Sequence, residues 1–152
     1  MTLRILFPAF AILACVTHGV YADCSQQEAN KQIVLDFYDK AINQKDFEAA
    51  SRHLGAQYIQ HNPLAANGPE GLKAFLEFAK KNIPNYRTEF KRVFADGDFV
   101  IVHAHARANP DDPADRGTAV MDIFRLENGK VVEHWDVAQP VPEKANNDNG
   151  MF

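Results

Sequence analysis

The sequence predicts an α+β domain in which three amphipathic helices come first and a bent antiparallel sheet follows. Two observations support this class. Apolar residues recur at helical spacing up to residue 83, and from residue 86 onward apolar and polar residues alternate in four successive segments. Amphipathic helices must bury their apolar stripes against one face of the sheet. We therefore expect a twisted sheet that wraps around the longest helix and leaves a conical cavity.

The first two helices are predicted from capping residues and from the apolar spacing between them. Ser25 and Glu28 form an S-x-x-E capping pattern ahead of the first helix. Asn43-Gln44 interrupts that helix, and Asp46 begins a shorter second one. Gly55 is expected to end the second helix, because glycine is the usual residue just after a helix.

The third helix and the sheet follow a short extended segment, "QYIQHNP". Pro69 occupies a favourable first helical position, and this helix ends before Pro84. The joints between the later segments contain glycine or proline, as expected of antiparallel strands linked by hairpins. The four predicted strands are "YRTEFKRVFA", "DFVIVHAHARA", "GTAVMDIFRL" and "KVVEHWDVA".

The N-terminal residues have the pattern of a secretory signal peptide. Arg4 precedes the apolar run "ILFPAFAILACV", and Val20–Ala22 offers a small-residue cleavage site before Asp23. The run is shorter than the ~20 residues that span a bilayer, so we expect no membrane span. A lipoprotein signal with Cys15 as the lipidated residue is the minor alternative. We thus expect a secreted or periplasmic protein with a signal peptide at 1–22, a domain at 23–140 and a polar C-terminal arm at 141–152.

Composition excludes several classes of protein. The net charge is −4 and no basic run occurs, which argues against nucleic-acid binding. Cleavage before Asp23 would leave Cys24 as the single cysteine, which excludes an intramolecular disulfide. The 11 phenylalanines favour a β-rich core or an aromatic-lined cavity.

The last hairpin, "MDIFRLENGKVVEHWD", gathers ionisable residues, and its register depends on the turn. A two-residue Asn-Gly turn would place Asp122 on the face of Trp135. A three-residue loop would pair Leu126 with Lys130 and place Asp122 opposite His134. We favour the three-residue loop because it collects the ionisable residues among apolar ones. The inner face then carries Asp122, Phe124, Val132, His134 and Asp136, and the outer face carries Met121, Ile123, Arg125, Val131, Glu133 and Trp135.

The inner face has the groups needed to remove a proton from a carbon next to a carbonyl. A carboxylate in an apolar pocket is a better proton acceptor at neutral pH, so Asp136 is the candidate general base. His134 and Asp122 would orient it, and Phe124 would contact the substrate. The alternative is a buried ion pair that only stabilises the sheet.

The segment "YIQHNP" supplies two further candidates for substrate contact. His61 lies at the end of regular structure, before Pro63, and could donate a hydrogen bond at the cavity rim. Tyr58 could be a phenolic donor, with a core residue as the alternative. Asn62 is interpreted as a turn residue that bonds the local backbone.

We predict that neither a metal nor a cofactor is required. His103 and His105 alternate on one strand face, a spacing that can ligate zinc, but no local motif such as H-E-x-x-H accompanies them. Solvated or hydrogen-bonded histidines are the favoured interpretation. No G-x-G-x-x-G, P-loop or G-x-S-x-G pattern occurs, which disfavours a nucleotide cofactor or a serine nucleophile.

Four segments resemble the SnoaL-like branch of the nuclear transport factor 2-like superfamily: "QYIQHNP", "FADGDFVIVHAH", "MDIFRLENGKVVEHWDVAQPVPE" and "NNDNGMF". The resemblance implies a cone with a pocket at its wide end, homodimers packed through the sheet, and cofactor-independent aldol-type cyclases. It assigns the acid/base aspartate to Asp136 and its partner to Asp122. The known cyclases carry a histidine near the latter position, and His134 could substitute for it from the facing strand.

Together these observations predict an exported enzyme for enolisation or aldol-type chemistry on a small hydrophobic carbonyl compound. The alternative is a non-catalytic protein of the same fold that binds a small ligand or acts as a dimeric interaction module.

Overall fold

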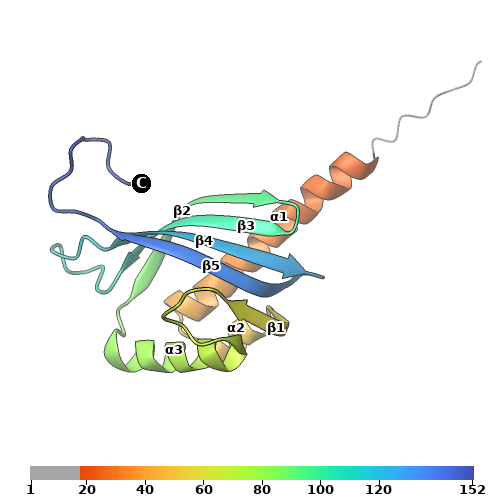
Figure 1. Ribbon diagram of the computed structural model, residues 1–152, viewed down its shortest axis with the longest axis horizontal. Helices are drawn as coiled ribbons and strands as arrows, with labels where there is room; N and C mark the ends of the chain where they lie inside the picture. Colours follow the sequence, from red (N-terminus) through yellow and green to blue (C-terminus); the bar gives the residue numbers. More distant parts are fainter. Residues whose placement is uncertain (1–17) are drawn as a thin grey trace, which may run out of the picture.

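The helices precede the sheet in the computed structural model, which describes residues 18–152, with side chains from Cys24 onward. The helical part contains α1 (His18–Tyr38), the π-helical turn η1 (Asp39–Asn43), α2 (Phe47–Ser51) and α3 (Gly68–Asn82). The strands are β1 (Leu54–Gln60), β2 (Arg87–Asp96), β3 (Phe99–Arg107), β4 (Thr118–Glu127) and β5 (Lys130–Pro140). The predicted α+β class and the four predicted hairpin-linked strands are confirmed (Figure 1).

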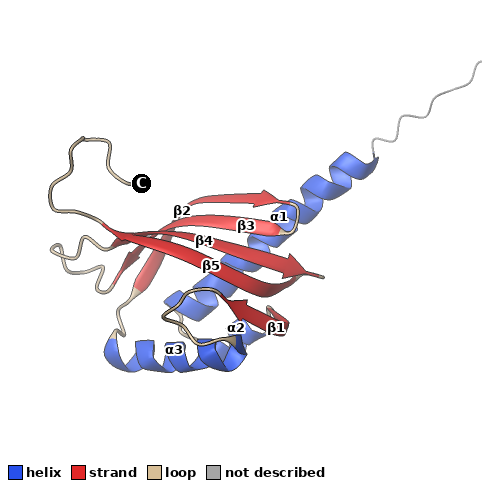
Figure 2. Cartoon of the chain, viewed as in Figure 1, coloured by secondary structure: helices blue, strands red, loops and turns tan. Residues whose placement is uncertain are grey.

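The five strands form one curled sheet in the order β1-β5-β4-β3-β2. The β2, β3, β4 and β5 neighbours pair antiparallel, whereas β1 pairs parallel to β5, so the sheet is mixed and not purely antiparallel as predicted. The sheet curls around α1, and α3 packs against β1 at one edge (Figure 2). The core between helices and sheet contains Val34, Phe37, Tyr38, Val100, Val102, Phe124, Leu126 and Val131.

Two of the predicted helix boundaries differ in the structure. Helix α1 begins at His18, so Ser25 lies inside the helix and does not cap it. Residues ahead of Ser25 continue the helical hydrogen bonds, which leaves no unpaired backbone N–H for that side chain to satisfy. The predicted start of α2 is confirmed, because the Asp46 side chain accepts a hydrogen bond of 3.0 Å from the Ala49 backbone N–H.

Gly55 does not end α2, as the sequence suggested, but lies within β1. A Cβ at this position would approach Cγ1 of Val132 to 2.6 Å. The glycine therefore allows the β1 backbone to lie close against β5.

The turn between β4 and β5 has two residues, and the predicted three-residue loop is wrong. Asn128 and Gly129 both have positive φ, 52° and 72°, as in a type I′ turn. Leu126 consequently pairs with Val131 and not with Lys130. Val131 is buried in the core, although the sequence placed it on the outer face.

A β-bulge restores the predicted inner face in spite of this turn. The register shifts by one residue at Val132, so Arg125 pairs with Glu133, and Asp122 pairs with Asp136 and not with His134. The pocket side of the hairpin carries Asp122, Phe124, His134 and Asp136, as predicted. The predicted grouping of these four residues on one face is therefore confirmed, but the β-bulge produces it and not the predicted three-residue loop.

The C-terminal arm leaves β5 and curves back toward the sheet (Figure 1). Residues 142–150 are mostly exposed. Phe152 then stacks on His103 and His105, with ring centroids 5.6 and 4.2 Å away.

The predicted signal run and Cys15 lie outside the described residues. Helix α1 extends across the predicted cleavage site after Ala22. In the described part of the chain, no helix is both long enough and apolar enough to span a bilayer.

Candidate functional site

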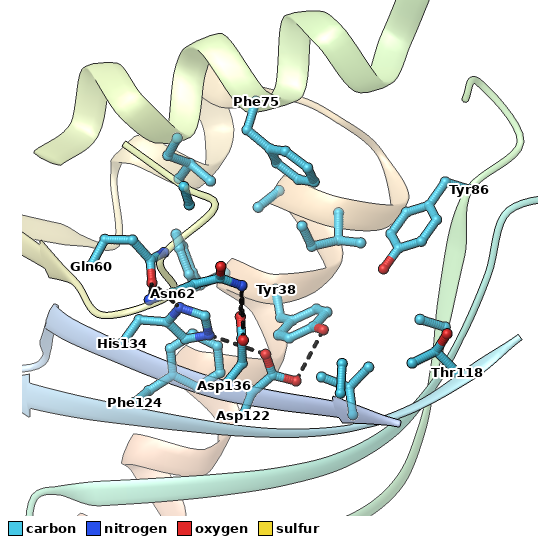
Figure 3. Close-up of a pocket in the computed structure, with 18 of the residues that line it drawn as sticks. Tyr38, Gln60, Asn62, Phe75, Tyr86, Thr118, Asp122, Phe124, His134 and Asp136 are labelled. Atoms are coloured by element: carbon cyan, nitrogen blue, oxygen red, sulfur yellow. Dashed lines mark hydrogen bonds and ion pairs between the residues drawn. The ribbon is translucent and has the colours of Figure 1, made fainter. Parts of the chain in front are cut away.

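A pocket of about 510 Å³ lies between the inner face of the sheet and the helices, within the range typical of small-molecule sites. Side chains of α1, η1, α3 and the loop before β2 form much of its wall. Polar groups from β1, the loop after it, β4 and β5 converge on one side of it (Figure 3). They are Tyr58, Gln60, Asn62, Asp122, His134 and Asp136.

Asp122 and His134 form a buried pair at the base of the pocket. Their exposed fractions are 3% and 7%, and His134 Nε2 lies 3.1 Å from Asp122 Oδ1. The Tyr38 hydroxyl donates to the other oxygen, Asp122 Oδ2, at 3.1 Å. Burial raises the pKa of Asp122, and the hydrogen bonds from His134 and Tyr38 only partly oppose that increase.

The number of protons in this pair follows from the orientation of Gln60. The backbone N–H of Asn62 donates to Gln60 Oε1 at 2.8 Å, which identifies that atom as the oxygen. His134 Nδ1 lies 3.0 Å from the same oxygen and must carry a hydrogen. A second proton lies between Nε2 and Asp122, as imidazolium with carboxylate or as imidazole with carboxylic acid. The pair is neutral in both forms.

Aromatic side chains hold the His134 ring in place. The Phe124 ring lies 4.7 Å away at an interplanar angle of 30°, and the Tyr58 ring lies 6.5 Å away at 19°. Phe124, a predicted substrate contact, borders the pocket but is almost fully buried. Its main role in the structure is therefore to support His134.

Asp136, unlike Asp122 beside it, is partly exposed in the pocket. Both of its oxygens lie 2.8 Å from Nδ2 of Asn62. The Asn62 amide is oriented by the Leu64 backbone N–H, which donates to Oδ1 at 2.8 Å. Asn62 thus makes the predicted turn and also holds Asp136, a contact that the sequence did not reveal because it spans 74 residues.

The Tyr58 hydroxyl is a hydrogen-bond donor that faces the pocket. It accepts a weak bond of 3.5 Å from Gln60 Nε2, and within residues 24–152 no bond occurs in which it donates. Burial and the nearby charges of Asp122 and Asp136 raise its pKa well above 10, so the phenol keeps its proton at neutral pH. The hydroxyl can therefore donate to an oxygen of a bound ligand.

His61, which the sequence placed at the cavity rim, does not line the pocket. Its Nε2 lies 2.8 Å from Glu133 Oε1, and its ring stacks on Trp135 at 4.6 Å and 3°. The alternation along β1 explains this position. Tyr58 and Gln60 point inward, so His61 points to the outer face of the sheet.

The inner carboxylates and His134 could in principle hold a cation. Asp122, His134 and Asp136 each offer a ligand atom, all within 4.8 Å of one another. A metal would have to displace the proton shared by His134 and Asp122 and the Asn62 contact of Asp136, so we keep the prediction that none is required.

His103 and His105 do not belong to the group of Asp122, His134 and Asp136. Arg92 Nη1 donates to His103 Nδ1 at 3.0 Å, and His105 Nε2 donates to the Arg116 carbonyl at 2.8 Å. These bonds agree with the interpretation of His103 and His105 as hydrogen-bonded strand histidines.

The curled sheet, packed on helices around a pocket lined by both apolar and acidic side chains, places the chain in a class of small α+β proteins with an internal pocket. The sequence pattern of the SnoaL-like domain matches residues 34–134, which is more than half of the chain. The chain therefore belongs to the SnoaL-like family, as its sequence motifs indicated. Comparison with curated protein sequences gives no significant match.

Solved structures of the nuclear transport factor 2-like type share this fold. A Bacillus cereus protein assigned as a polyketide cyclase is 20% identical, with a TM-score of 0.62 over 72% of this chain and 74% of that one. A Cytophaga hutchinsonii nuclear transport factor 2-like protein of unknown function is 20% identical, with a TM-score of 0.59 over 73% and 90%. An LEH-like epoxide hydrolase of M. tuberculosis is 17% identical, with a TM-score of 0.62 over 75% and 85%. At these identities the likeness establishes the fold alone.

Proposed function

We propose that the protein carries out acid/base chemistry without a cofactor on a small hydrophobic carbonyl compound, by enolisation or an aldol-type step. The observation that carries the proposal is the Asp136 carboxylate. It opens into an apolar pocket and is held by an amide beside a buried, neutral Asp122–His134 pair. The cyclase assignment of one structural relative is consistent with this chemistry.

Asp136 is the proposed general base. It takes a proton from the carbon next to the carbonyl, and the C–H electron pair forms the carbon–carbon double bond of an enolate. The carbonyl π pair moves to oxygen, where the Tyr58 hydroxyl donates a hydrogen bond. Where the substrate has a β,γ carbon–carbon double bond, the enolate is a dienolate, and return of the proton to its γ-carbon completes an isomerisation. In an aldol step the enolate carbon attacks a second carbonyl, and the new alkoxide takes the proton from Asp136.

The Asp122–His134 pair supports this step by remaining neutral. Asp122 and Asp136 are directly opposite in the sheet, where two carboxylates would repel each other. The proton held between His134 and Asp122 removes that repulsion and leaves Asp136 as the charged acceptor. Asn62 fixes the direction of the carboxylate.

The alternative function is that of a non-catalytic protein that binds a small apolar ligand. One observation favours it: both oxygens of Asp136 already accept from Asn62, as in a purely structural contact. The two functions predict different behaviour toward the same ketone.

The test uses 2-tetralone, a small apolar ketone with acidic hydrogens next to its carbonyl. Binding is followed by thermal shift and calorimetry, and exchange of the α-hydrogens in D₂O is followed by NMR. The enzymatic proposal predicts binding with exchange faster than in buffer. Binding without faster exchange supports the binder, and absence of binding contradicts both.

We also propose that the protein is exported and forms a homodimer through its sheet. The outer face exposes Phe94, Phe99, Met121 and Val137, which a second copy would cover. Sedimentation of the purified protein measures the dimer. Sequencing of the mature N-terminus tests export, with Asp23 expected as the first residue and a lipidated Cys15 as the contrary result.

A further inference from the structure

The pocket has a second polar region on the side away from Asp136. Tyr86 lies just before β2, and Thr118 begins β4. Figure 3 shows both across the pocket from Gln60 and Asn62, with the Tyr86 hydroxyl directed into the cavity. Much of the remaining pocket lining is apolar and includes Ile42, Leu72, Phe75, Ala106 and Val120.

The hydroxyls of this region are free to bind a ligand. Among the described residues, the Thr118 hydroxyl has no hydrogen bond, and Tyr86 makes none of normal geometry through its hydroxyl. Burial raises the pKa of Tyr86, and the neighbouring Thr88 hydroxyl opposes the increase. The Thr88 hydroxyl is itself buried and has no partner of normal geometry. Tyr86 and Thr118 are half-buried and line the pocket, so water can reach their hydroxyls in the unliganded protein, and a ligand oxygen would take the place of that water.

The charges around the pocket restrict the kind of oxygen that can bind. Within the part of the chain that the structure describes, Asp115, Asp122 and Asp136 line the pocket, and no lysine or arginine does. Burial and the nearby carboxylate of Asp136 also disfavour a negative charge at the Tyr86 hydroxyl. A carboxylate would be repelled, whereas a neutral carbonyl or hydroxyl oxygen would not.

We propose that Tyr86 and Thr118 form a second subsite that binds an uncharged oxygen of the same ligand whose carbonyl lies at Tyr58 and Asp136. The substrate is then a neutral hydroxyketone or dicarbonyl compound, and not a keto acid. This inference rests on the proposed function and adds the substrate class to it.

The experiment compares calorimetric titrations of 2-tetralone with those of its 5-, 6- and 7-hydroxy derivatives and of 6-carboxy-2-tetralone. At least one hydroxyketone should bind the wild type roughly 3- to 10-fold more tightly than 2-tetralone, the ratio that one net hydrogen bond gives. The carboxylate should bind more weakly than 2-tetralone.

Two matched tyrosine variants measure the contribution of each end of the pocket to binding. Tyr86→Phe should abolish the preference for the hydroxyketone and leave the affinity for 2-tetralone unchanged. Tyr58→Phe should weaken both ketones by the same factor and keep the preference. Thr118→Val provides a second test at the new subsite and should reduce the preference.

The outcomes distinguish this inference from the proposed function. If 2-tetralone binds and no hydroxyl derivative binds more tightly, or if the preference survives both Tyr86→Phe and Thr118→Val, the subsite does not exist. Tighter binding of the carboxylate also overturns it. If none of the ketones binds the wild type, the carbonyl-binding function itself fails, and the subsite fails with it.

Discussion

A histidine–carboxylate pair lies on each face of β5, with His134 contacting Asp122 of β4 on the inner face and His61, which follows β1, contacting Glu133 on the outer face, and the two carboxylates have opposite pKa shifts. On the inner face, His134 lies 3.1 Å from Asp122, and burial raises the pKa of Asp122. On the outer face, His61 lies 2.8 Å from Glu133, and hydrogen bonds from His61 and Arg125 lower the pKa of Glu133.

The difference between the two pKa shifts comes from the hydration of the carboxylates and not from residue type. The side chains of His61 and Glu133 are 41% and 14% exposed, and those of His134 and Asp122 are 9% and 5% exposed. The Glu133 carboxylate keeps part of its hydration and gains from nearby donors, which lower its pKa, whereas the Asp122 carboxylate loses its hydration, which raises its pKa. Successive residues of β5 point to opposite faces, so Glu133 belongs to the outer pair and His134 to the inner pair. Only the inner pair borders the pocket.

The largest expected effect comes from replacing Asp136, the second acid of the inner face. Asp136→Asn keeps shape and volume but removes the proton acceptor, so exchange of the 2-tetralone α-hydrogens should fall by roughly 10²–10⁴-fold. Ligand binding and melting temperature should be retained. The control is Glu133→Gln on the outer face, which should leave exchange unchanged. A destabilised Asp136→Asn protein with near-normal exchange would mean that Asp136 is structural.

Truncation of the buried acid should reduce stability more than truncation of the outer one. Asp122→Ala leaves His134 and the Tyr38 hydroxyl without a partner in a buried site, and loss of one member of a buried pair costs about 3–5 kcal/mol. Glu133→Ala breaks contacts that water can replace, so its effect should be much smaller. Urea unfolding of both variants measures the difference. Equal losses would show that burial does not separate the two faces.

The dependence of stability on pH should be opposite for the two acids. Because the pKa of Asp122 is raised in the folded protein, the native state binds more protons than the unfolded chain between the two pKa values. The contribution of Asp122 to stability therefore falls as pH rises through that window. In the Asp122→Asn variant, the asparagine can still donate to His134 and accept from Tyr38. The free energy of unfolding of this variant should fall less with rising pH than that of the wild type.

Glu133 has a lowered pKa, so its contribution is present above the unfolded pKa and is lost as pH falls through the folded one. Glu133→Gln should remove part of the stability loss on acidification. Unfolding free energies measured at a series of pH values from about 3 to 7 test both variants. The same sign of change for both variants would contradict the comparison.

The smallest expected effect is that of metal removal. The inner face brings three possible ligand atoms within 4.8 Å of one another, but two of these residues already share a proton. Chelator treatment should leave binding and exchange of 2-tetralone unchanged, and elemental analysis should find no stoichiometric metal. A bound transition metal whose removal abolishes exchange would replace the acid/base proposal with metal-assisted chemistry.

Much of the fold could be predicted from the sequence because it follows from local rules. The start of α2 at Asp46 and the four hairpin-linked strands depend on capping and alternation within a few residues. Gly55 was misinterpreted because glycine suits both a helix end and a close strand contact. Asn62, Gln60 and Tyr86 were not predicted as site residues, because each acts on the pocket through contacts that are distant in sequence or made by a loop.

The sequence by itself determined that Asp122, Phe124, His134 and Asp136 could share one face, because they alternate along two adjacent strands. Only the tertiary structure decided how they do so. The Asn-Gly turn alone would have put Asp122 on the opposite face from His134, and the bulge at Val132 reverses that. Val132 is where β5 meets Gly55 of β1, so the register depends on a strand about 75 residues earlier in the chain. Alternation is a property of neighbouring residues, whereas register and burial depend on which distant segments pack together.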